Sequence, residues 1–172
     1  LFMYYFLAGL LFFIFIILNI FSENKSIHNF MKYIFIIFRS SIVLLFIAHT
    51  LGLIARWYIS GHAPWGDAYE SMIYVAWATM GIGLLFIKKS DLTLASTSFV
   101  TSMILMIAHW NWMDPSIANL VPVLNSYWLM IHVSVIVGSY GPFALSMILG
   151  FVSLLLIVFI TRTNKEKIKN QL

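Results

Sequence analysis

The sequence predicts an all-α fold: a polytopic membrane protein with about five transmembrane helices, forming one membrane domain over residues 1–172. Composition is the first reason, because 62% of the residues are hydrophobic and only 9% are charged, whereas soluble domains carry about 25% charged residues. The second reason is that the apolar residues fall in long runs, and about 20 of them suffice to cross a bilayer. These properties exclude a soluble globular domain, a disordered chain and, despite a net charge of +4, a nucleic-acid binder.

Five segments meet the length required of a transmembrane helix. They are residues 1–21, 33–58, 69–87, 92–110 and 127–160. The first is too long and too evenly apolar for a signal peptide, and it lacks a basic start and a small-residue cleavage site. The second carries Arg39 and Arg56 near its opposite ends, where a guanidinium can extend to the lipid headgroups.

The third segment follows a loop rich in proline and glycine and ends at Lys88 and Lys89. The fourth carries a cluster of hydroxyl side chains: Thr93, Ser96, Thr97, Ser98, Thr101 and Ser102. Hydroxyls that bond to their own helix or to a neighbouring one explain this cluster. The fifth segment has 34 residues and would be about 51 Å long as a continuous helix, which is more than a bilayer requires.

The lysine and arginine residues predict the orientation, because basic residues concentrate in cytoplasmic loops. If the helices alternate in direction, eight of the ten basic residues fall on one side. These are Lys25, Lys32, Lys88, Lys89, Arg162, Lys165, Lys167 and Lys169. The N-terminus is therefore expected outside and the C-terminal tail in the cytoplasm. The chain also opens at Leu1 without an initiator methionine and closes in a charged stretch, so we expect a piece of a longer polypeptide.

Tryptophans gather on the side expected to be outside. Five of the six lie in or beside the two outer loops: Trp57, Trp65, Trp110, Trp112 and Trp128. An interfacial aromatic belt explains Trp57 and Trp110. It explains Trp65 and Trp112 less well, because they lie inside the loops, near Asp67 and Asp114. This asymmetry predicts that the protein performs its function at the outer face.

The five histidines differ in their expected depth. His28 is expected in an inner loop and solvated, while His62 and His109 are expected at the outer surface as interfacial polar residues. His49 lies within the second segment, where an ionisable side chain predicts a function, although a neutral imidazole hydrogen-bonded to a neighbouring helix is an equal alternative.

His132 is the strongest functional candidate. About 20 residues counted back from Arg162 place the outer boundary of the bilayer near residues 141–142. His132 would then stand about 12 Å or more above the hydrocarbon, on a helix that projects outward. There it could be a packed polar group, a metal ligand or an axial ligand to haem iron. The chain contains no cysteine, so thiolate metal sites and disulfides are excluded.

Two motifs give the chain a resemblance to a known family. Residues 56–71 read RWYISGHAPWGDAYES, and residues 121–133 read VPVLNSYWLMIHV. The first resembles the pattern R-W-x-x-S-G-H-x-P-x-x-x-x-Y-E-S of the CcsA-type cytochrome c biogenesis proteins, the system II cytochrome c synthases. The second is similar to that family's segment with an external haem-ligating histidine. The resemblance covers residues 45–160 and is closest to the fused CcsB–CcsA proteins of epsilon-proteobacteria.

The resemblance implies a cytochrome c haem lyase in a bacterial inner (cytoplasmic) membrane. Such a protein exports haem b, holds it at the outer, periplasmic face and attaches it to the Cys-x-x-Cys-His motif of apocytochrome c, together with a CcsB-type region or subunit. The resemblance makes His132 a haem axial ligand and His62 a residue that structures its loop. The other expected outer-loop contacts of this site are Trp65, Asp67, Tyr69, Glu70 and Trp128.

The chain also departs from the family pattern. The tryptophan-rich motif W-G-x-x-W-x-W-D is absent, and no second external histidine follows His132. We therefore expect this piece alone to be inactive. Two alternatives remain open from the residues: an outward-facing transport or scaffold subunit, and an electron-transfer subunit that binds haem or quinone.

Overall fold

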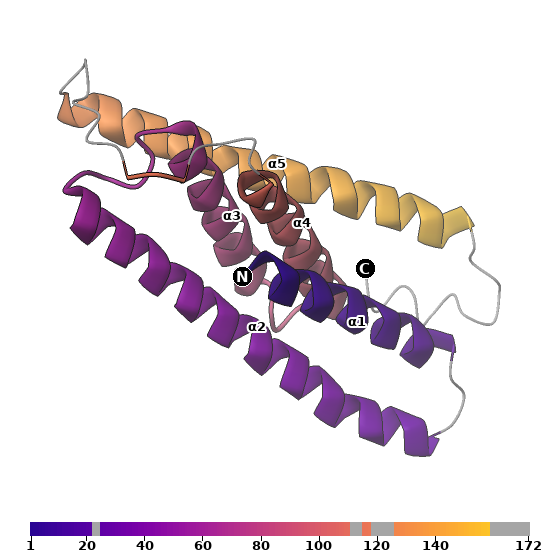
Figure 1. Cartoon of the computed structure of the whole chain (residues 1–172). Helices are drawn as coiled ribbons and strands as arrows, with labels where there is room; N and C mark the ends of the chain where they lie inside the picture. Colours follow the sequence, from indigo (N-terminus) through magenta and orange to yellow (C-terminus); the bar gives the residue numbers. More distant parts are fainter. Residues whose placement is uncertain (22–24, 111–114, 118–125, 159–172) are drawn as a thin grey trace.

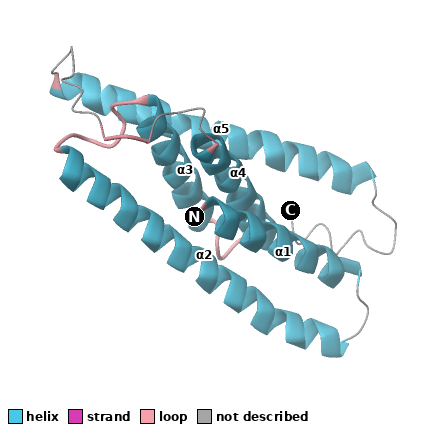
Figure 2. Ribbon diagram, viewed as in Figure 1, coloured by secondary structure: helices cyan, strands magenta, loops and turns pink. Residues whose placement is uncertain are grey.

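The computed structural model describes residues 1–21, 25–110, 115–117 and 126–158, and every regular element among them is an α-helix (Figures 1 and 2). The helices are α1 (Phe2–Phe21), α2 (Lys25–Ser60), α3 (Ala68–Leu85), α4 (Asp91–His109) and α5 (Tyr127–Val158). The prediction of an all-α fold with five helices is confirmed.

Successive helices run in opposite directions, so the connections gather at two ends of the bundle (Figure 1). We call the end with residues 61–67 the loop end, and the end with Lys88 and Lys89 the lysine end. At the centre, α4 packs against α1 and α3, and α3 also packs against α5. The long helix α2 lies to one side and touches mainly α1 and α3 (Figure 1).

Within the described residues, four helices are long and apolar enough to cross a membrane: α1, α2, α4 and α5. The predicted third span is α3, which does not meet this criterion although it forms as expected. It has only 18 residues, and these include the polar first turn with Tyr69 and Glu70. With its four apolar helices the chain is a multi-pass membrane protein.

The largest difference from the predicted boundaries lies at the start of α2. The prediction placed residues 22–32 in a loop, but α2 already begins at Lys25. Residues 25–32 are mostly polar and contain no proline or glycine, so they can continue the helix beyond the apolar segment. Hydropathy identifies the part of a helix that suits lipid, not the point where the helix begins. At the other end of the chain, α5 continues through Pro142, and residues 159–160 of the predicted segment lie outside the described residues.

The hydroxyl side chains of α4 contribute to helix packing, as the sequence indicates. Thr97 Oγ1 donates to the carbonyl of Thr93 at 2.6 Å, and Ser102 Oγ donates to the carbonyl of Phe99 at 2.6 Å. All but Thr93 of the six are buried, and small hydroxyl residues let membrane helices approach closely. The cluster therefore supports the architecture and is not a row of ligands.

Close packing of α5 on α3 depends on Gly141. A methyl group added there would collide with both the side chain and the backbone of Thr79. We expect Gly141→Ala to lower the free energy of unfolding by about 1–3 kcal/mol, the usual cost of overpacking. Gly150→Ala is the matched control, because a methyl group on Gly150 meets nothing within 4 Å. Unfolding by denaturing detergent in mixed micelles measures both variants, and equal stability would contradict the packing argument.

The lysine distribution predicts that the loop end faces outside, and cysteine labelling can test this orientation. Ser126 and Lys89 are exposed at opposite ends of the bundle, and the chain has no cysteine of its own. In intact cells we expect a membrane-impermeant maleimide to label Ser126→Cys, and Lys89→Cys only after permeabilisation. The reverse pattern would invert the topology.

Candidate functional site at the loop end

The loop between α2 and α3 is shaped by its own backbone and side-chain hydrogen bonds. Gly61 ends α2 with a φ of 70°, a left-handed conformation that favours glycine, and its N–H donates to the carbonyl of Trp57 at 3.0 Å. Asp67 caps α3, since its carboxylate accepts from the N–H of Glu70 at 2.6 Å. The sequence therefore holds residues 61–67 in one conformation above the helices.

A buried ion pair fastens this loop to α2. The side chain of Glu70 is only 1% exposed, and it accepts from Arg56 Nε at 3.0 Å and from the N–H of Gly66 at 2.9 Å. Arg56 also donates through Nη1 to the carbonyl of Pro115 at 3.1 Å and through Nη2 to that of Ser116 at 3.2 Å. One guanidinium thus joins the end of α2, the start of α3 and the connection between α4 and α5.

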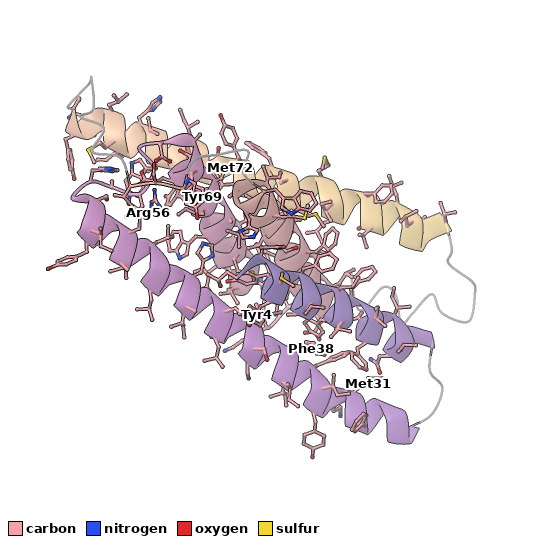
Figure 3. The ribbon with its side chains drawn as sticks, in the orientation of Figure 1. Tyr4, Met31, Phe38, Arg56, Tyr69 and Met72 are labelled. Atoms are coloured by element: carbon pink, nitrogen blue, oxygen red, sulfur yellow. The ribbon has the colours of Figure 1, made fainter. Side chains whose placement is uncertain are left out.

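The remaining charged and aromatic groups of the loop surround this pair. The Arg56 guanidinium lies 4.9 Å from the centre of the Tyr69 ring, and the two side chains approach each other from α2 and α3 (Figure 3). His62 Nδ1 lies 3.7 Å from a carboxylate oxygen of Glu70, in line with the loop-structuring role expected for His62. We refer to these residues as the Arg56 cluster: Arg56, His62, Asp67, Tyr69 and Glu70.

Both arginines of α2, which are expected near the headgroups, form ion pairs with other helices. Arg56 pairs with Glu70, and Arg39 pairs with Asp91 of α4 at 2.7 Å. Hydropathy alone could not reveal these partners, because each ion pair joins different helices. The signal for Arg56 was its place in the same motif as Glu70, on the other side of a short loop.

Trp65 does not face outward from the loop but packs onto α3. Its ring centre lies 5.0 Å from that of Tyr74 and 6.2 Å from that of Trp57. Tyr74 in turn stacks on Trp77 at 5.8 Å, whose indole N–H donates to Thr50 Oγ1 at 2.9 Å. A row of aromatic rings therefore leads from the loop into the interface between α2 and α3.

His132 and Trp128 lie apart from this arrangement, on the first turns of α5. They are one helical turn apart and both are exposed. Within the described residues, none of the ion pairs or the ring contact that define the Arg56 cluster involves either side chain. Trp112, Asp114 and residues 121–125 of the second motif lie outside the described residues.

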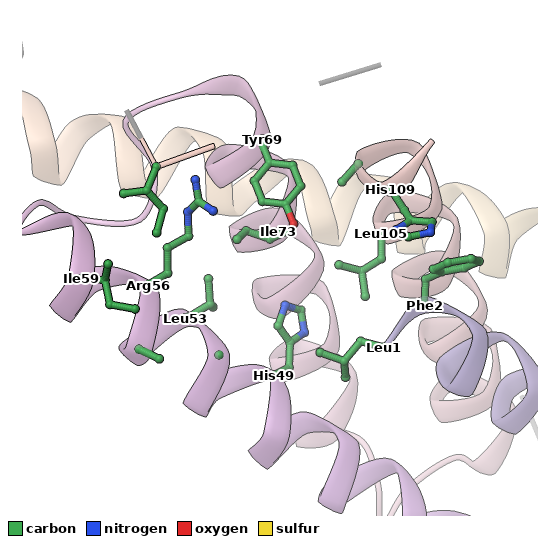
Figure 4. Close-up of a pocket in the computed structure, with 14 residues that line it drawn as sticks. Leu1, Phe2, His49, Leu53, Arg56, Ile59, Tyr69, Ile73, Leu105 and His109 are labelled. Atoms are coloured by element: carbon green, nitrogen blue, oxygen red, sulfur yellow. The ribbon is translucent and has the colours of Figure 1, made fainter. Parts of the chain in front are cut away.

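Below the Arg56 cluster, α1, α2, α3 and α4 line a partly open cavity of about 460 Å³, which sequence reasoning did not predict (Figure 4). His49, Arg56, Tyr69 and His109 are among its lining residues. His49 is 4% exposed, and the backbone of Ile73 on the neighbouring helix α3 lies within hydrogen-bonding reach of its ring, although no bond of full geometry forms in the described part of the chain. His109 instead packs against Phe2, with the ring centres 4.9 Å apart and the ring planes tilted by 37°.

Comparison with known proteins identifies the family. The family described as Cytochrome C assembly protein matches residues 65–172, more than half of the chain. Protein NrfI of Wolinella succinogenes is 48% identical over 115 residues, which are 67% of this chain and 13% of NrfI. The cytochrome c biogenesis protein CcsA of Prochlorococcus marinus is 31% identical over 156 residues, 83% of this chain and 46% of that protein. CcsA of Guizotia abyssinica is 39% identical over 117 residues, which are 62% of this chain and 34% of that protein.

The chain spans less than half the length of each of these relatives. The family match includes Asp67, Tyr69 and Glu70 of the Arg56 cluster, and also Trp128 and His132 of α5. The resemblance seen in the two sequence motifs is thereby confirmed. The chain belongs to the cytochrome c assembly protein family, with CcsA-type cytochrome c biogenesis proteins among its relatives.

Proposed function

We propose that the whole protein is a cytochrome c haem lyase, and that this chain supplies one of the groups that hold haem at the outer face. The observation that carries the proposal is the exposed imidazole of His132 at the loop end, inside the region matched by the family. A histidine nitrogen is a common axial ligand of haem iron, and an exposed one can be reached by a large planar substrate.

The surroundings of His132 suit this role. Trp128 lies one turn earlier on α5 with 77% of its surface exposed, so its indole can lie beside a porphyrin bound to His132. Neither side chain is needed to hold the helices together, since both lie on the exposed part of α5. They are therefore free to contact a substrate.

The Arg56 cluster acts on this site indirectly. It fixes the loop of residues 61–67 and the carbonyls of Pro115 and Ser116 at the end of the bundle where α5 begins. Its own carboxylates are engaged, so Asp67 and Glu70 position the loop and do not bind the iron.

Attachment requires chemistry that reaches beyond this chain. In the proposed reaction each thiol of the Cys-x-x-Cys-His motif in apocytochrome c adds across one vinyl group of haem, with the thiol hydrogen passing to the vinyl carbon. His132 holds the iron while the thiols approach, and the histidine of the apocytochrome can then replace it. The second external ligand, a tryptophan-rich loop and a CcsB-type region complete the site elsewhere in the protein.

The proposal is tested with the whole protein, produced together with an apocytochrome c reporter in a host that lacks its own maturation system. We expect the reporter to carry haem that survives denaturing electrophoresis. A reporter with both cysteines of its motif replaced by serine is the control and should carry none. If the intact reporter stays free of haem while both proteins accumulate in the membrane fraction, the lyase assignment is wrong.

A further inference from the structure

The cavity at the loop end has the size and lining of a small-molecule site. Its volume of about 460 Å³ falls within the range of about 300–1,000 Å³ that is usual for ligand pockets. Most of its lining is apolar and comes from four helices: Phe2, Leu53, Ile59, Ile73, Leu105 and Ala108. The haem attachment proposed above does not use this space.

His49 gives the cavity an unmet hydrogen-bonding requirement. Its ring points into the cavity from α2 (Figure 4) and is 4% exposed, yet no hydrogen bond of full geometry reaches Nδ1 or Nε2 in the described part of the chain, and the nearby backbone of Ile73 can engage one nitrogen at most. The hydroxyl of fully buried Tyr5, whose ring centre lies 6.2 Å from that of His49, also lacks a hydrogen-bond partner there. A buried polar group without a partner costs about 1–3 kcal/mol, so such groups in native proteins almost always have one.

A second polar group faces the cavity from another helix. Tyr69 of α3 directs its hydroxyl toward the space above His49 (Figure 4). A ligand between them would meet a donor or an acceptor on each side and apolar walls around its ring. An aromatic or quinonoid ring with oxygen atoms at opposite positions satisfies this arrangement.

The charges in the wall favour an uncharged ligand. Among the described residues, Arg56 is the only lysine or arginine that lines the cavity, and its guanidinium already serves Glu70, Asp67 and two backbone carbonyls. The two carboxylates of a haem would therefore find no cation available there. At the rim, Ile59 is 67% exposed, so an apolar tail could leave the cavity toward lipid.

From these features we propose that the cavity binds the headgroup of an isoprenoid quinone, as quinone or quinol, with His49 bonded to one ring oxygen and Tyr69 to the other. The tail extends past Ile59 into the bilayer. This site is distinct from His132, which lies on the first turns of α5 and does not line the cavity. The protein would thus bind a membrane quinone in addition to haem.

The test uses the whole purified protein in nanodiscs of quinone-free lipid, with decylubiquinone as the probe and equilibrium binding as the readout. We expect saturable binding to the wild type and at least about tenfold weaker binding to His49→Phe, which keeps an aromatic ring but removes both nitrogens. His49→Gln restores a donor and an acceptor and should bind within about threefold of the wild type. Leu53→Trp fills the cavity without altering His49 and should abolish binding.

Controls separate this site from the proposed haem site. His132→Gly should bind decylubiquinone like the wild type, and His49→Phe should retain its haem. Thermal unfolding of each variant shows whether it is folded. The proposal is overturned if the wild type does not bind the quinone or if His49→Phe and Leu53→Trp bind it unchanged. Loss of haem from folded His49→Phe with unaltered quinone affinity would equally overturn it and make the cavity a haem site.

Discussion

Replacing His132 by glycine in the whole protein is expected to remove most of the bound haem. Changes to residues that merely support a metal ligand already weaken metal binding by about 10–100-fold, so loss of the ligand itself should cost at least about tenfold. Glycine leaves a space the size of an imidazole beside Trp128, one turn away on the exposed part of α5. Added imidazole should enter this space and restore part of the Soret absorbance, which the visible spectrum measures.

His109→Gly is the matched control for this experiment. His109 is also exposed near the loop end, at the last residue of α4, but its ring packs against that of Phe2 in a tilted arrangement. We expect this variant to keep its haem and to be insensitive to imidazole. A Soret band of normal height in His132→Gly would remove His132 from the haem site while leaving the family assignment untouched.

The sequence predicts the helices of this protein well because the membrane restricts the choices. A bilayer requires backbone groups to be satisfied within a helix, so each long apolar run must be helical. This argument does not predict where a helix ends once the chain has left the bilayer. For example, α2 begins at Lys25, whereas hydropathy predicted a start at residue 33. Outside the lipid, the end of a helix depends on caps and breakers rather than on hydropathy.

Contacts between helices are the part that the sequence does not predict. Arg56 and Glu70 are 14 residues apart, and only the turn at Gly61 and the cap at Asp67 bring their side chains together. The cavity is harder still to foresee, because its walls come from four helices and its polar groups, His49 and Tyr69, belong to different ones. The sequence identified His49 as unusual from its depth alone, whereas the absence of a hydrogen bond of full geometry to its ring, in the described part of the chain, is visible only in the structure.

The second large effect is expected from Arg56→Met, which leaves the carboxylate of Glu70 buried without its cation. Removing one partner of a buried ion pair costs about 3–5 kcal/mol, because the remaining charge stays out of water. The side chains of this pair are only 12% and 1% exposed, so solvent can compensate little. We therefore expect a marked loss of stability in mixed micelles and less protein in the membrane fraction. Arg56→Lys should retain only part of the wild-type stability, since an ammonium group cannot reproduce the bonds to Glu70, Pro115 and Ser116 at once.

The other ion pair of α2 is the control, because it shows whether the loss of stability comes from burial of the remaining carboxylate or merely from loss of a positive charge. Arg39 also pairs with a carboxylate, that of Asp91, but its side chain is 37% exposed. Arg39→Met should therefore cost no more than about 1 kcal/mol. In a double-mutant cycle, Arg56→Met with Glu70→Met should be less harmful than the sum of the two single changes, by about 0.5–3 kcal/mol. Additive effects would mean that the two side chains stabilise the loop end independently, and the view of Arg56 as the group that joins α2 to α3 would have to be abandoned.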